Sequence, residues 1–285
     1  MEKYLGKPDW LKIRLQSNEQ FLRTKRIVES HCLHTICSSG RCPNQGECWS
    51  RGRATFMIGG DVCTRACRFC NTLTGKPKPL DPSEADRVAE SIRLMGLKYA
   101  VITSVDRDDL PDLGARHWFD AIKRIKEVNP DTALETLIPD FQGRHELIDM
   151  IVQAAPETVS HNLETVRRLS PQIRSAAGYE RSLSVLSRVA SAGITAKTGI
   201  MVGLGETPDE VSELMDDALR AGVSILTIGQ YLQPSRKNIA VSEYITPEQF
   251  AAYRTLGLDK GFAHVESAPL VRSSYRKGET VNNEG

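Results

Sequence analysis

The sequence predicts an α/β fold, a partial (βα)6 barrel of the TIM type with an extension at each end. Short β-branched runs alternate with amphipathic stretches from about Thr55 onward, a pattern typical of parallel strands joined by helices. Such a chain forms either an open doubly wound sheet or a barrel. Residues 55–260 give about 34 residues to each of six units, against roughly 31 per unit in a complete eight-unit barrel. Six units leave the barrel incomplete.

Six segments have the composition of strands in this barrel. Each is short, rich in β-branched residues and bounded by turn-forming or polar residues. They are Thr55 to Ile58, Tyr99 to Thr103, Ala133 to Ile138, Thr158 to Ser160, Thr195 to Val202 and Ser224 to Ile228.

Three helices begin at recognisable capping sequences. Asp81-Pro82-Ser83-Glu84, the segment from Thr207 to Glu210 and the segment from Thr246 to Gln249 each place proline after a capping side chain, with Glu or Gln two residues on. The stretch after Thr207 carries one apolar stripe and stops at Gly222, which predicts a helix packed on a sheet.

Composition indicates a soluble, cytoplasmic enzyme. The chain has 285 residues, 40% hydrophobic and 26% charged content, and a formal net charge of +1. This charge does not favour binding to nucleic acid or a membrane surface, and no apolar run approaches the roughly 18 residues that a membrane-spanning helix needs. Residues 1–15 lack the apolar core of a signal peptide. Since seven cysteines is an odd number, we expect reduced thiols rather than a disulfide framework.

Six of the seven cysteines form two triplets, and this spacing predicts metal ligands. Cys63, Cys67 and Cys70 follow the first predicted strand, so they belong at the carboxyl-terminal mouth, where barrel active sites lie. Their spacing lets one loop hold three corners of a cubane iron-sulfur cluster and leave the fourth iron open. The other triplet lies upstream; its members are Cys37, Cys42 and Cys48.

Each triplet also has an alternative interpretation. The later triplet could be part of a structural zinc site, although such sites usually combine two separated pairs of ligands. The earlier triplet could join Cys32 in a four-thiolate zinc or electron-transfer site. We expect Cys32 to be a small buried side chain and not a ligand.

Polar residues and glycines near predicted strand ends are candidates for a cofactor pocket at the mouth. These segments also have purely structural interpretations. The segment from Val202 to Glu206 could be a simple strand-to-helix turn, and Asp106 to Asp109 could be a solvated loop. His161 could be a core histidine, and we do not interpret it as catalytic. Gly203 and Gly205 do not form a dinucleotide fingerprint, because no third glycine follows. The candidates are Thr103, Ser104, Glu135, Asn162, Lys197, Gly203 and Gly205.

The spacing Cys63-x3-Cys67-x2-Cys70, with Phe69 before the last cysteine, resembles the radical S-adenosylmethionine superfamily, whose fold is a partial (βα)6 barrel. Further segments narrow the resemblance to the lipoyl synthase family over residues 30 to 278. The most specific pair is the upstream cysteine triplet with the terminal Arg-Ser-Ser-Tyr motif. The segments are Cys37-x4-Cys42-x5-Cys48, Ile102 to Asp109, Pro139 to Phe141, His161 to Thr165, Met201 to Glu206 and Arg272 to Tyr275.

The resemblance implies a sulfur-inserting transferase with two 4Fe-4S clusters and S-adenosyl-L-methionine. Cys63, Cys67 and Cys70 would hold the cluster that cleaves S-adenosylmethionine to a 5'-deoxyadenosyl radical. Two such radicals would activate carbons 6 and 8 of an octanoyl chain amide-linked to a carrier-protein lysine. An auxiliary cluster would donate both sulfurs and be consumed. Its implied ligands are Cys37, Cys42, Cys48 and a tail serine, assigned to Ser274 with Ser273 second; the implied cofactor contacts include Phe69 and Glu164.

The resemblance also implies partners. These are octanoylated lipoyl carrier domains of 2-oxoacid dehydrogenase acyltransferases and the glycine-cleavage carrier protein, a ferredoxin or flavodoxin reductant, and an iron-sulfur carrier protein. We expect a monomer. Basic residues beside both cluster segments would form a docking face for an acidic carrier: Arg51, Arg53, Lys76, Lys78, Arg272, Arg276 and Lys277.

The expected organisation has three parts. Residues 1–50 form an N-terminal extension with the auxiliary-cluster cysteines, residues 51–262 the barrel, and residues 263–285 a tail with the serine motif. Two other functions remain open: another radical enzyme with a second cluster, such as a biotin synthase or a methylthiolating enzyme, and a ferredoxin-like electron carrier. A ferredoxin-like electron carrier would need four cysteines for each cluster and would not need a barrel of this size.

Overall fold

The computed structural model describes residues 6–13, 17–174 and 176–275. Its main sheet has eight strands in the order β1-β2-β5-β6-β7-β8-β9-β10. The short β1 is antiparallel to β2, and every other neighbouring pair is parallel. The strands are β1 (His34–Thr35), β2 (Thr55–Ile58), β5 (Tyr99–Ser104), β6 (Ala133–Leu137), β7 (Thr158–Ser160), β8 (Thr195–Val202), β9 (Ile225–Gln230) and β10 (His264–Ser267).

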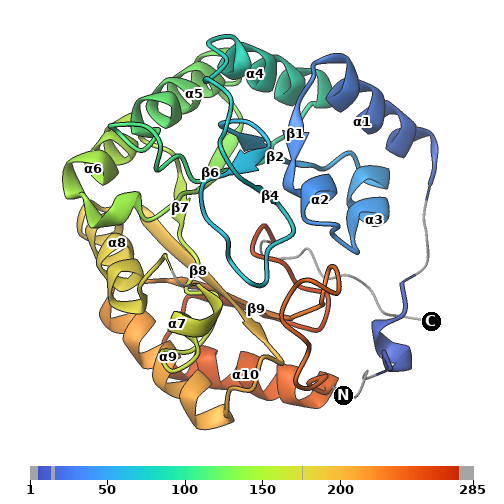
Figure 1. Ribbon diagram of the computed structural model, residues 1–285, viewed down its shortest axis with the longest axis vertical. Helices are drawn as coiled ribbons and strands as arrows, with labels where there is room; N and C mark the ends of the chain where they lie inside the picture. Colours follow the sequence, from blue (N-terminus) through green and yellow to red (C-terminus); the bar gives the residue numbers. More distant parts are fainter. Residues whose placement is uncertain (1–5, 14–16, 175, 276–285) are drawn as a thin grey trace.

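The sheet curves into a partial barrel surrounded by helices (Figure 1). Within the described residues no ladder joins β1 to β10, so the sheet is not closed. The helices are α1 (Glu19–Ser30), α2 (Ile36–Ser39), α3 (Gln45–Ser50), α4 (Glu84–Met95), α5 (Ala115–Val128), α6 (His145–Ala154), α7 (Ser170–Ile173), α8 (Tyr179–Ser191), α9 (Pro208–Arg220) and α10 (Pro247–Lys260), with 3-10 turns η1 (Asp9–Leu11) and η2 (Phe141–Gly143).

The six predicted strands are present, with bounds that differ by two residues at most. The structure adds β10, which pairs in parallel with β9 and makes a seventh parallel strand. The sequence signal for β10 was weak because only Val265 and the flanking Phe262 are strongly apolar in this segment. Four residues assigned to the tail therefore belong to the sheet.

Two of the three predicted helix starts are confirmed. Thr207 and Glu210 form a capping box at the start of α9, and the side chain of Thr246 caps α10. The predicted start at Pro82 is wrong. Oδ1 of Asp81 accepts hydrogen bonds from the amide and the hydroxyl of Ser83 at 2.8 and 2.7 Å, which forms a turn, and α4 begins only at Glu84.

The core lies between the strands and the apolar faces of the surrounding helices. On α5, Trp118, Ile122 and Ile125 are buried, and they are spaced at helical intervals. The predicted stripe of α9 is buried at Val211, Leu214, Met215 and Ala218. This packing fixes the carboxyl ends of the strands relative to one another.

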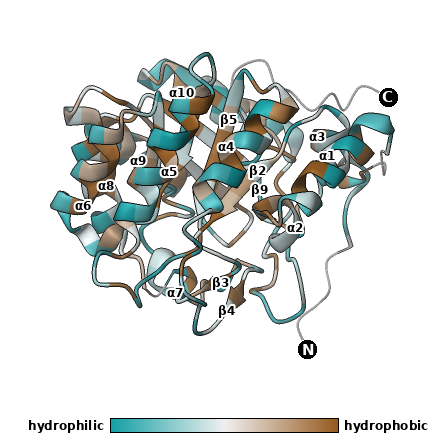
Figure 2. Cartoon of the chain, turned by 90° about the horizontal axis from the view of Figure 1, so that it is seen from above, coloured by the Kyte–Doolittle hydropathy of each residue, from teal (hydrophilic) through white to brown (hydrophobic). Residues whose placement is uncertain are grey.

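Loops and short elements gather at the carboxyl ends of the strands. A two-stranded ladder, β3 (Val62–Cys63) with β4 (Leu73–Thr74), follows β2 and holds the later cysteine triplet. Figure 2 shows β3, β4 and α7 together at one end of the molecule, which is this carboxyl end. No helix among the described residues has both the length and the apolar character to span a membrane.

Candidate functional site

A cavity of about 1070 Å³ opens at the carboxyl ends of the strands and extends along β2 and β5 as far as their first residues, Thr55 and Tyr99. We call it the mouth cavity. Its lining comes from strand ends, the loop between β3 and β4, the segment carrying α2 and α3, and the tail. All six triplet cysteines line it: Cys37, Cys42, Cys48, Cys63, Cys67 and Cys70.

Backbone amides of the cysteine loop and of the segment after β5 point at sulfur atoms of the later triplet. The amides of Arg65 and Asp106 donate to Sγ of Cys63 at 3.4 and 3.3 Å, and the amide of Thr72 donates to Sγ of Cys70 at 3.5 Å. Amides so placed stabilise negative charge on sulfur, and hydrogen bonds to sulfur tune the potential of iron-sulfur clusters. The loop is therefore built to present thiolates.

Without a bound metal these thiols are expected to be neutral. Burial raises the pKa of Cys63 to about 11, with the Asp106 carboxylate adding to the shift. Burial also raises the pKa of Cys67 to about 12, although the Arg174 guanidinium opposes it. A metal ion would reverse this balance by deprotonating the coordinating thiol. The soft sulfur donors suit iron-sulfur chemistry.

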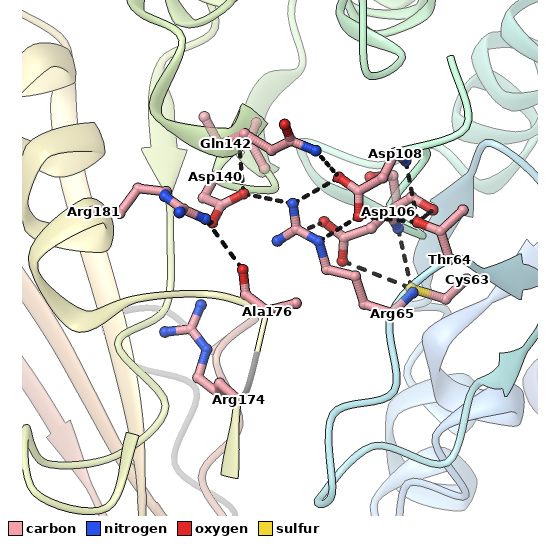
Figure 3. Close-up of polar contacts among 12 residues, drawn as sticks. Cys63, Thr64, Arg65, Asp106, Asp108, Asp140, Gln142, Arg174, Ala176 and Arg181 are labelled. Carbon is pink, nitrogen blue, oxygen red and sulfur yellow. Dashed lines mark hydrogen bonds and ion pairs between the residues drawn. The ribbon is translucent and has the colours of Figure 1, made fainter. Parts of the chain in front are cut away.

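Arg65, between Cys63 and Cys67, anchors the cysteine loop through an ion network (Figure 3). Its buried guanidinium lies 3.2 Å from a carboxylate oxygen of Asp106, 2.7 Å from one of Asp108 and 2.8 Å from one of Asp140. Burial alone would lower the pKa of Arg65, but the hydrogen bonds to Asp108 and the Asp106 charge outweigh burial and raise it. These contacts connect the cysteine loop to the ends of β5 and β6.

The ion network also shifts the pKa values of the carboxyl groups around Arg65. Burial raises the pKa of Asp106 to about 6, against the opposing charge of Arg65. Burial would also raise the pKa of Asp140, but the hydrogen bond and charge of Arg65 outweigh it and lower the pKa to about 2. The solvated-loop interpretation of Asp106 to Asp109 is therefore wrong for Asp106 and Asp108, whose side chains contact Arg65 and Thr64.

The earlier triplet is held by two short helices. Cys37 lies in α2, which Thr35 caps, and Cys48 lies in α3. The amide of Cys42 donates to the carbonyl of Cys37 at 2.9 Å, which closes the turn between the helices. Burial raises the pKa of Cys37 to about 11 and that of Cys48 to about 12, with the neighbouring cysteines adding to both shifts.

The tail motif reaches the same cavity from the other end of the chain. Ser273 and Ser274 line the mouth cavity, as do Arg272 and Tyr275. The phenol of Tyr275 accepts a hydrogen bond from Nδ2 of Asn44 at 2.5 Å, so the tail touches the segment between Cys42 and Cys48. The predicted basic residues Arg276 and Lys277 lie outside the described residues.

Cys32 lies apart from these groups. It is exposed just after α1 and does not line the mouth cavity, so the expectation of a buried side chain is wrong. Its backbone has a positive φ of 49°, which turns the chain out of the helix. Within the described residues, no three His, Cys, Asp or Glu side chains are grouped closely enough for one metal ion. A cubane cluster differs in placing each thiolate on a different iron.

Five of the predicted cofactor contacts line the mouth cavity: Phe69, Thr103, Ser104, Asn162 and Glu164. Within the described residues, the buried Oδ1 of Asn162 has no hydrogen-bond partner. Glu164 has a positive φ of 63°, and burial raises the pKa of its carboxyl group. An unpartnered acceptor beside the carboxyl group of a half-buried residue with a strained backbone is typical of a site for a polar ligand.

Four other predicted contacts are not at the cavity. Glu135 and Lys197 form a buried ion pair inside the barrel, with Nζ of Lys197 2.8 and 2.9 Å from the two carboxylate oxygens. Gly203 packs against Gln230 and the backbone of Glu243, and Gly205 faces Ser242. Both glycines have positive φ, 94° and 104°, which the turn into α9 requires.

His161 is a satisfied core histidine, as the sequence suggested. Its ring nitrogens contact the carbonyl of Ile138 and the hydroxyl of Ser182, both at 2.9 Å. Burial lowers the pKa of His161 to about 4. The ring is therefore neutral near pH 7.

Sequence reasoning missed Arg65, Asn44 and Arg174. Arg174 is buried, lines the cavity and donates to the carbonyl of Leu163 at 3.0 Å. For Arg65 and Asn44 the sequence did offer one indication of a role at the site, because each lies between two cysteines of a triplet.

Comparison with known proteins identifies the family. Residues 57–218 match the Radical SAM superfamily. Lipoyl synthase of Parabacteroides distasonis is 74% identical over 275 residues, covering 96% of this chain and 98% of the relative. Lipoyl synthase of Porphyromonas gingivalis is 66% identical, with 96% and 98% covered. Lipoyl synthase of Treponema denticola is 55% identical, with 96% and 95% covered.

Solved structures agree on the fold. The chain resembles Streptococcus suis SuiB bound to S-adenosylmethionine with a TM-score of 0.58 at 11% identity, covering 80% of this chain and 55% of that one. It resembles methylornithine synthase with a TM-score of 0.55 at 11% identity, covering 95% and 86%. At such identities the likeness concerns the fold alone. The partial barrel, the superfamily match and the full-length relatives together show that this chain belongs to the lipoyl synthase family of the radical SAM superfamily.

Proposed function

We propose that the mouth cavity is where this chain forms lipoyl groups, by inserting two sulfur atoms at carbons 6 and 8 of an octanoyl chain on a carrier-protein lysine. Family membership makes the chain a radical S-adenosylmethionine sulfurtransferase. The observation that carries the proposal is that both cysteine triplets and the tail serines line one cavity. A substrate chain in this cavity can reach both groups of ligands.

The later triplet would hold the cluster that receives S-adenosylmethionine. Cys63, Cys67 and Cys70 supply three thiolates, and a cubane with three protein ligands keeps one iron for another molecule. When bound, the cluster and S-adenosylmethionine supply a radical that abstracts hydrogen, one S-adenosylmethionine and one electron for each C–H bond. The chain's own part is to position the thiolates, which the amides at sulfur and the Arg65 network support.

The pocket for S-adenosylmethionine would lie along the ends of β5 and β7. Thr103 and Ser104 offer hydroxyl groups, and Asn162 offers an unpartnered carbonyl oxygen among the described residues. Glu164 adds a buried carboxyl group, while Phe69 adds an apolar ring. Glu135, Lys197, Gly203 and Gly205 are left out of this pocket because they contact other parts of the chain.

The cavity also offers an apolar wall for the octanoyl chain. Burying such a chain releases roughly 0.8 kcal/mol for each methylene group. The wall is lined by Met57, Val101, Leu137, Ile200, Met201 and Tyr231.

The auxiliary cluster would be the sulfur substrate. Cys37, Cys42 and Cys48 supply three ligands, and Ser274 supplies a hydroxyl oxygen, with Ser273 as the second candidate. Oxygen is a harder and weaker ligand for iron than thiolate, which suits a cluster that must release sulfur. Each new C–S bond takes one sulfur from this cluster, so one lipoyl group consumes two.

The partners follow from this chemistry. The carrier is an octanoylated lipoyl domain, a one-electron donor such as ferredoxin or flavodoxin feeds the first cluster, and an iron-sulfur carrier rebuilds the second. Arg51, Arg53 and Arg272 line the mouth cavity, whereas Lys76 and Lys78 are exposed after β4. A face of this charge would steer an acidic carrier toward the cavity.

The domain division is part of the same proposal. The N-terminal part contributes the auxiliary-cluster cysteines, and the tail after β10 contributes the serine. The barrel between them contributes the other triplet.

Anaerobic metal analysis tests this assignment. We expect about eight irons and eight sulfides per chain, no tightly bound zinc, and cleavage of S-adenosylmethionine in the presence of a reductant. Cys42→Ala should lower the iron content to about four, while Cys32→Ala serves as the matched control and should leave it at about eight. A loss of iron on changing Cys32, or bound zinc, would contradict the ligand assignment.

A further inference from the structure

The tail crosses the carboxyl end of the barrel in close contact with the end of β9. After β10, the carbonyl of Pro269 accepts a hydrogen bond from the amide of Gln230 at 3.1 Å. A Cβ atom at Gly229 would lie 2.2 Å from the carbonyl oxygen of Val271. The barrel thus admits the tail at this point because Gly229 has no side chain.

At the end of this crossing, a buried lysine of the barrel binds the tail backbone. Lys197 lies on β8 and is 2% exposed. Its Nζ contacts three oxygens: both carboxylate oxygens of Glu135, at 2.8 and 2.9 Å, and the carbonyl oxygen of Tyr275, at 2.7 Å. An ammonium group has three N–H donors, so each of these contacts uses one.

Glu135 is satisfied by the barrel itself. Besides Lys197, its carboxylate accepts hydrogen bonds from the hydroxyl of Ser160 at 2.7 Å and the phenol of Tyr99 at 2.5 Å. Among the residues that the structure describes, the tail carbonyl is therefore the one hydrogen-bond acceptor of Lys197 that lies outside the strands. If the tail left, Lys197 would keep both contacts to Glu135 but lose its third acceptor, and an ammonium donor left unpaired in this position is costly.

The other end of Tyr275 is held by the segment that carries the earlier triplet. Asn44 is 2% exposed, and its Nδ2 donates to the carbonyl of Leu270 at 2.6 Å and to the phenol of Tyr275 at 2.5 Å. An amide nitrogen has two donors, and both go to the tail. Tyr275 is thus held at two points. Lys197 of the barrel binds its carbonyl group, and Asn44, which lies between Cys42 and Cys48, binds its phenol.

We propose that Lys197, balanced by Glu135, and Asn44 are positioning residues that lock the tail so that Ser274 faces the earlier cysteine triplet. The inference rests on the proposed role of Ser274 and adds the contacts that place it. It gives the buried Lys197–Glu135 pair a role in sulfur delivery instead of in binding S-adenosylmethionine.

Hydrogen exchange on the full-length, cluster-loaded protein tests the lock directly. The amide of Tyr275 donates to the carbonyl of Arg272 at 2.9 Å, so its exchange reports on the tail. In the double variant Lys197→Met, Glu135→Gln, which removes both charges together, we expect tail exchange to accelerate on the order of 10- to 100-fold, since a hydrogen bond from a charged donor is lost. Unchanged tail exchange would overturn the proposal.

Asp217→Asn is the matched control. Asp217 is a buried carboxylate on α9 that contacts Arg167 and Tyr179, away from the mouth cavity, so it tests whether any lost buried charge loosens the tail. We expect its tail to exchange at the wild-type rate. Equal acceleration in both variants would mean that general destabilisation is the cause, and the positioning role would be wrong.

Two further measurements complete the test. Tyr275→Phe removes only the phenol oxygen, leaves the barrel untouched and should accelerate tail exchange several-fold, so the inference stays testable even if the double variant fails to fold. Both variants should still cleave S-adenosylmethionine while forming about tenfold less lipoyl product. If a variant showed accelerated tail exchange but formed lipoyl product at the wild-type level, the link between the tail and sulfur delivery would be wrong. If the wild-type protein did not use the sulfur of its own cluster, only the proposed function would be contradicted.

Discussion

Replacing Arg65 by methionine should destabilise the protein strongly, because three carboxylates share this one buried guanidinium. The Arg65 side chain is 6% exposed and that of Asp140 is 0% exposed. After the change, Arg181 at 3.1 Å is the one ion-pair partner that Asp140 keeps within the described part of the chain. Removing one partner of a buried ion pair costs about 3–5 kcal/mol. For a chain of 285 residues, with an unfolding entropy of about 2.1 cal/mol/K per residue, the midpoint of thermal unfolding should fall by about 5–8 °C.

Two comparisons make this prediction specific. Arg116→Met breaks an exposed pair with Asp120 on α5 and should change the midpoint by about 1 °C. Arg65→Lys keeps the charge but loses the planar fork, so it should give an intermediate loss. A midpoint for Arg65→Met equal to that of Arg116→Met would refute the stabilising role of the network.

The same variant has a predicted pH dependence. In the wild type the pKa of Asp140 is lowered to about 2, so the stability from its ionised form is complete above about pH 4 and is lost only as the pH falls toward 2. Without Arg65, Asp140 keeps its ion pair with Arg181 but loses the hydrogen bond and charge that lower its pKa most, so burial raises this pKa and protonation relieves part of the cost of a poorly compensated charge. The stability deficit of the variant should therefore shrink between pH 8 and pH 5, and a deficit that grows with acid would contradict the assignment.

Two further predictions concern the site. Cys67→Ala should abolish S-adenosylmethionine cleavage. Cys42→Ala should retain cleavage in the presence of an octanoylated carrier but form no lipoyl group. Lipoyl product from the Cys42→Ala variant would contradict the sulfur-donor role of the auxiliary cluster. Gly229→Ala should lower lipoyl formation about tenfold with cleavage retained, because the added Cβ would lie 2.2 Å from the carbonyl oxygen of Val271 and displace the tail. Gly178→Ala, where the added atom meets only Arg181 at 3.9 Å, should have no such effect, and equal losses in the two would show that tail displacement is not the cause.

The sequence was most informative where local spacing decides the structure. Six parallel strands were predictable because their β-branched runs are short and bounded, and the cysteine triplets because ligand spacing within one loop is local. The caps Thr207 and Thr246 were predictable for the same reason, since a capping side chain accepts a hydrogen bond from the amide three residues further along the chain.

Contacts between distant segments were not predictable. Lys197 and Glu135 are 62 positions apart, and from sequence a polar residue within a strand can equally be a ligand contact or half of a buried pair. The tail acceptor of Lys197 is 78 positions away and carries no sequence signal, because it is a backbone carbonyl. Similarly, β10 was missed because its own apolar signal is weak and its parallel pairing with β9 is a contact between separate segments.

The most direct test of the sulfur source is isotopic. The protein is loaded with clusters made from heavy-isotope sulfide and reacted with unlabelled octanoyl carrier, reductant and S-adenosylmethionine, and the lipoyl product is weighed by mass spectrometry. We expect two heavy sulfurs in every lipoyl group and about one product per chain, with turnover resuming only when an iron-sulfur carrier rebuilds the cluster on Cys37, Cys42, Cys48 and Ser274. Unlabelled product, or many turnovers without such a carrier, would contradict the claim that this cluster is the sulfur donor.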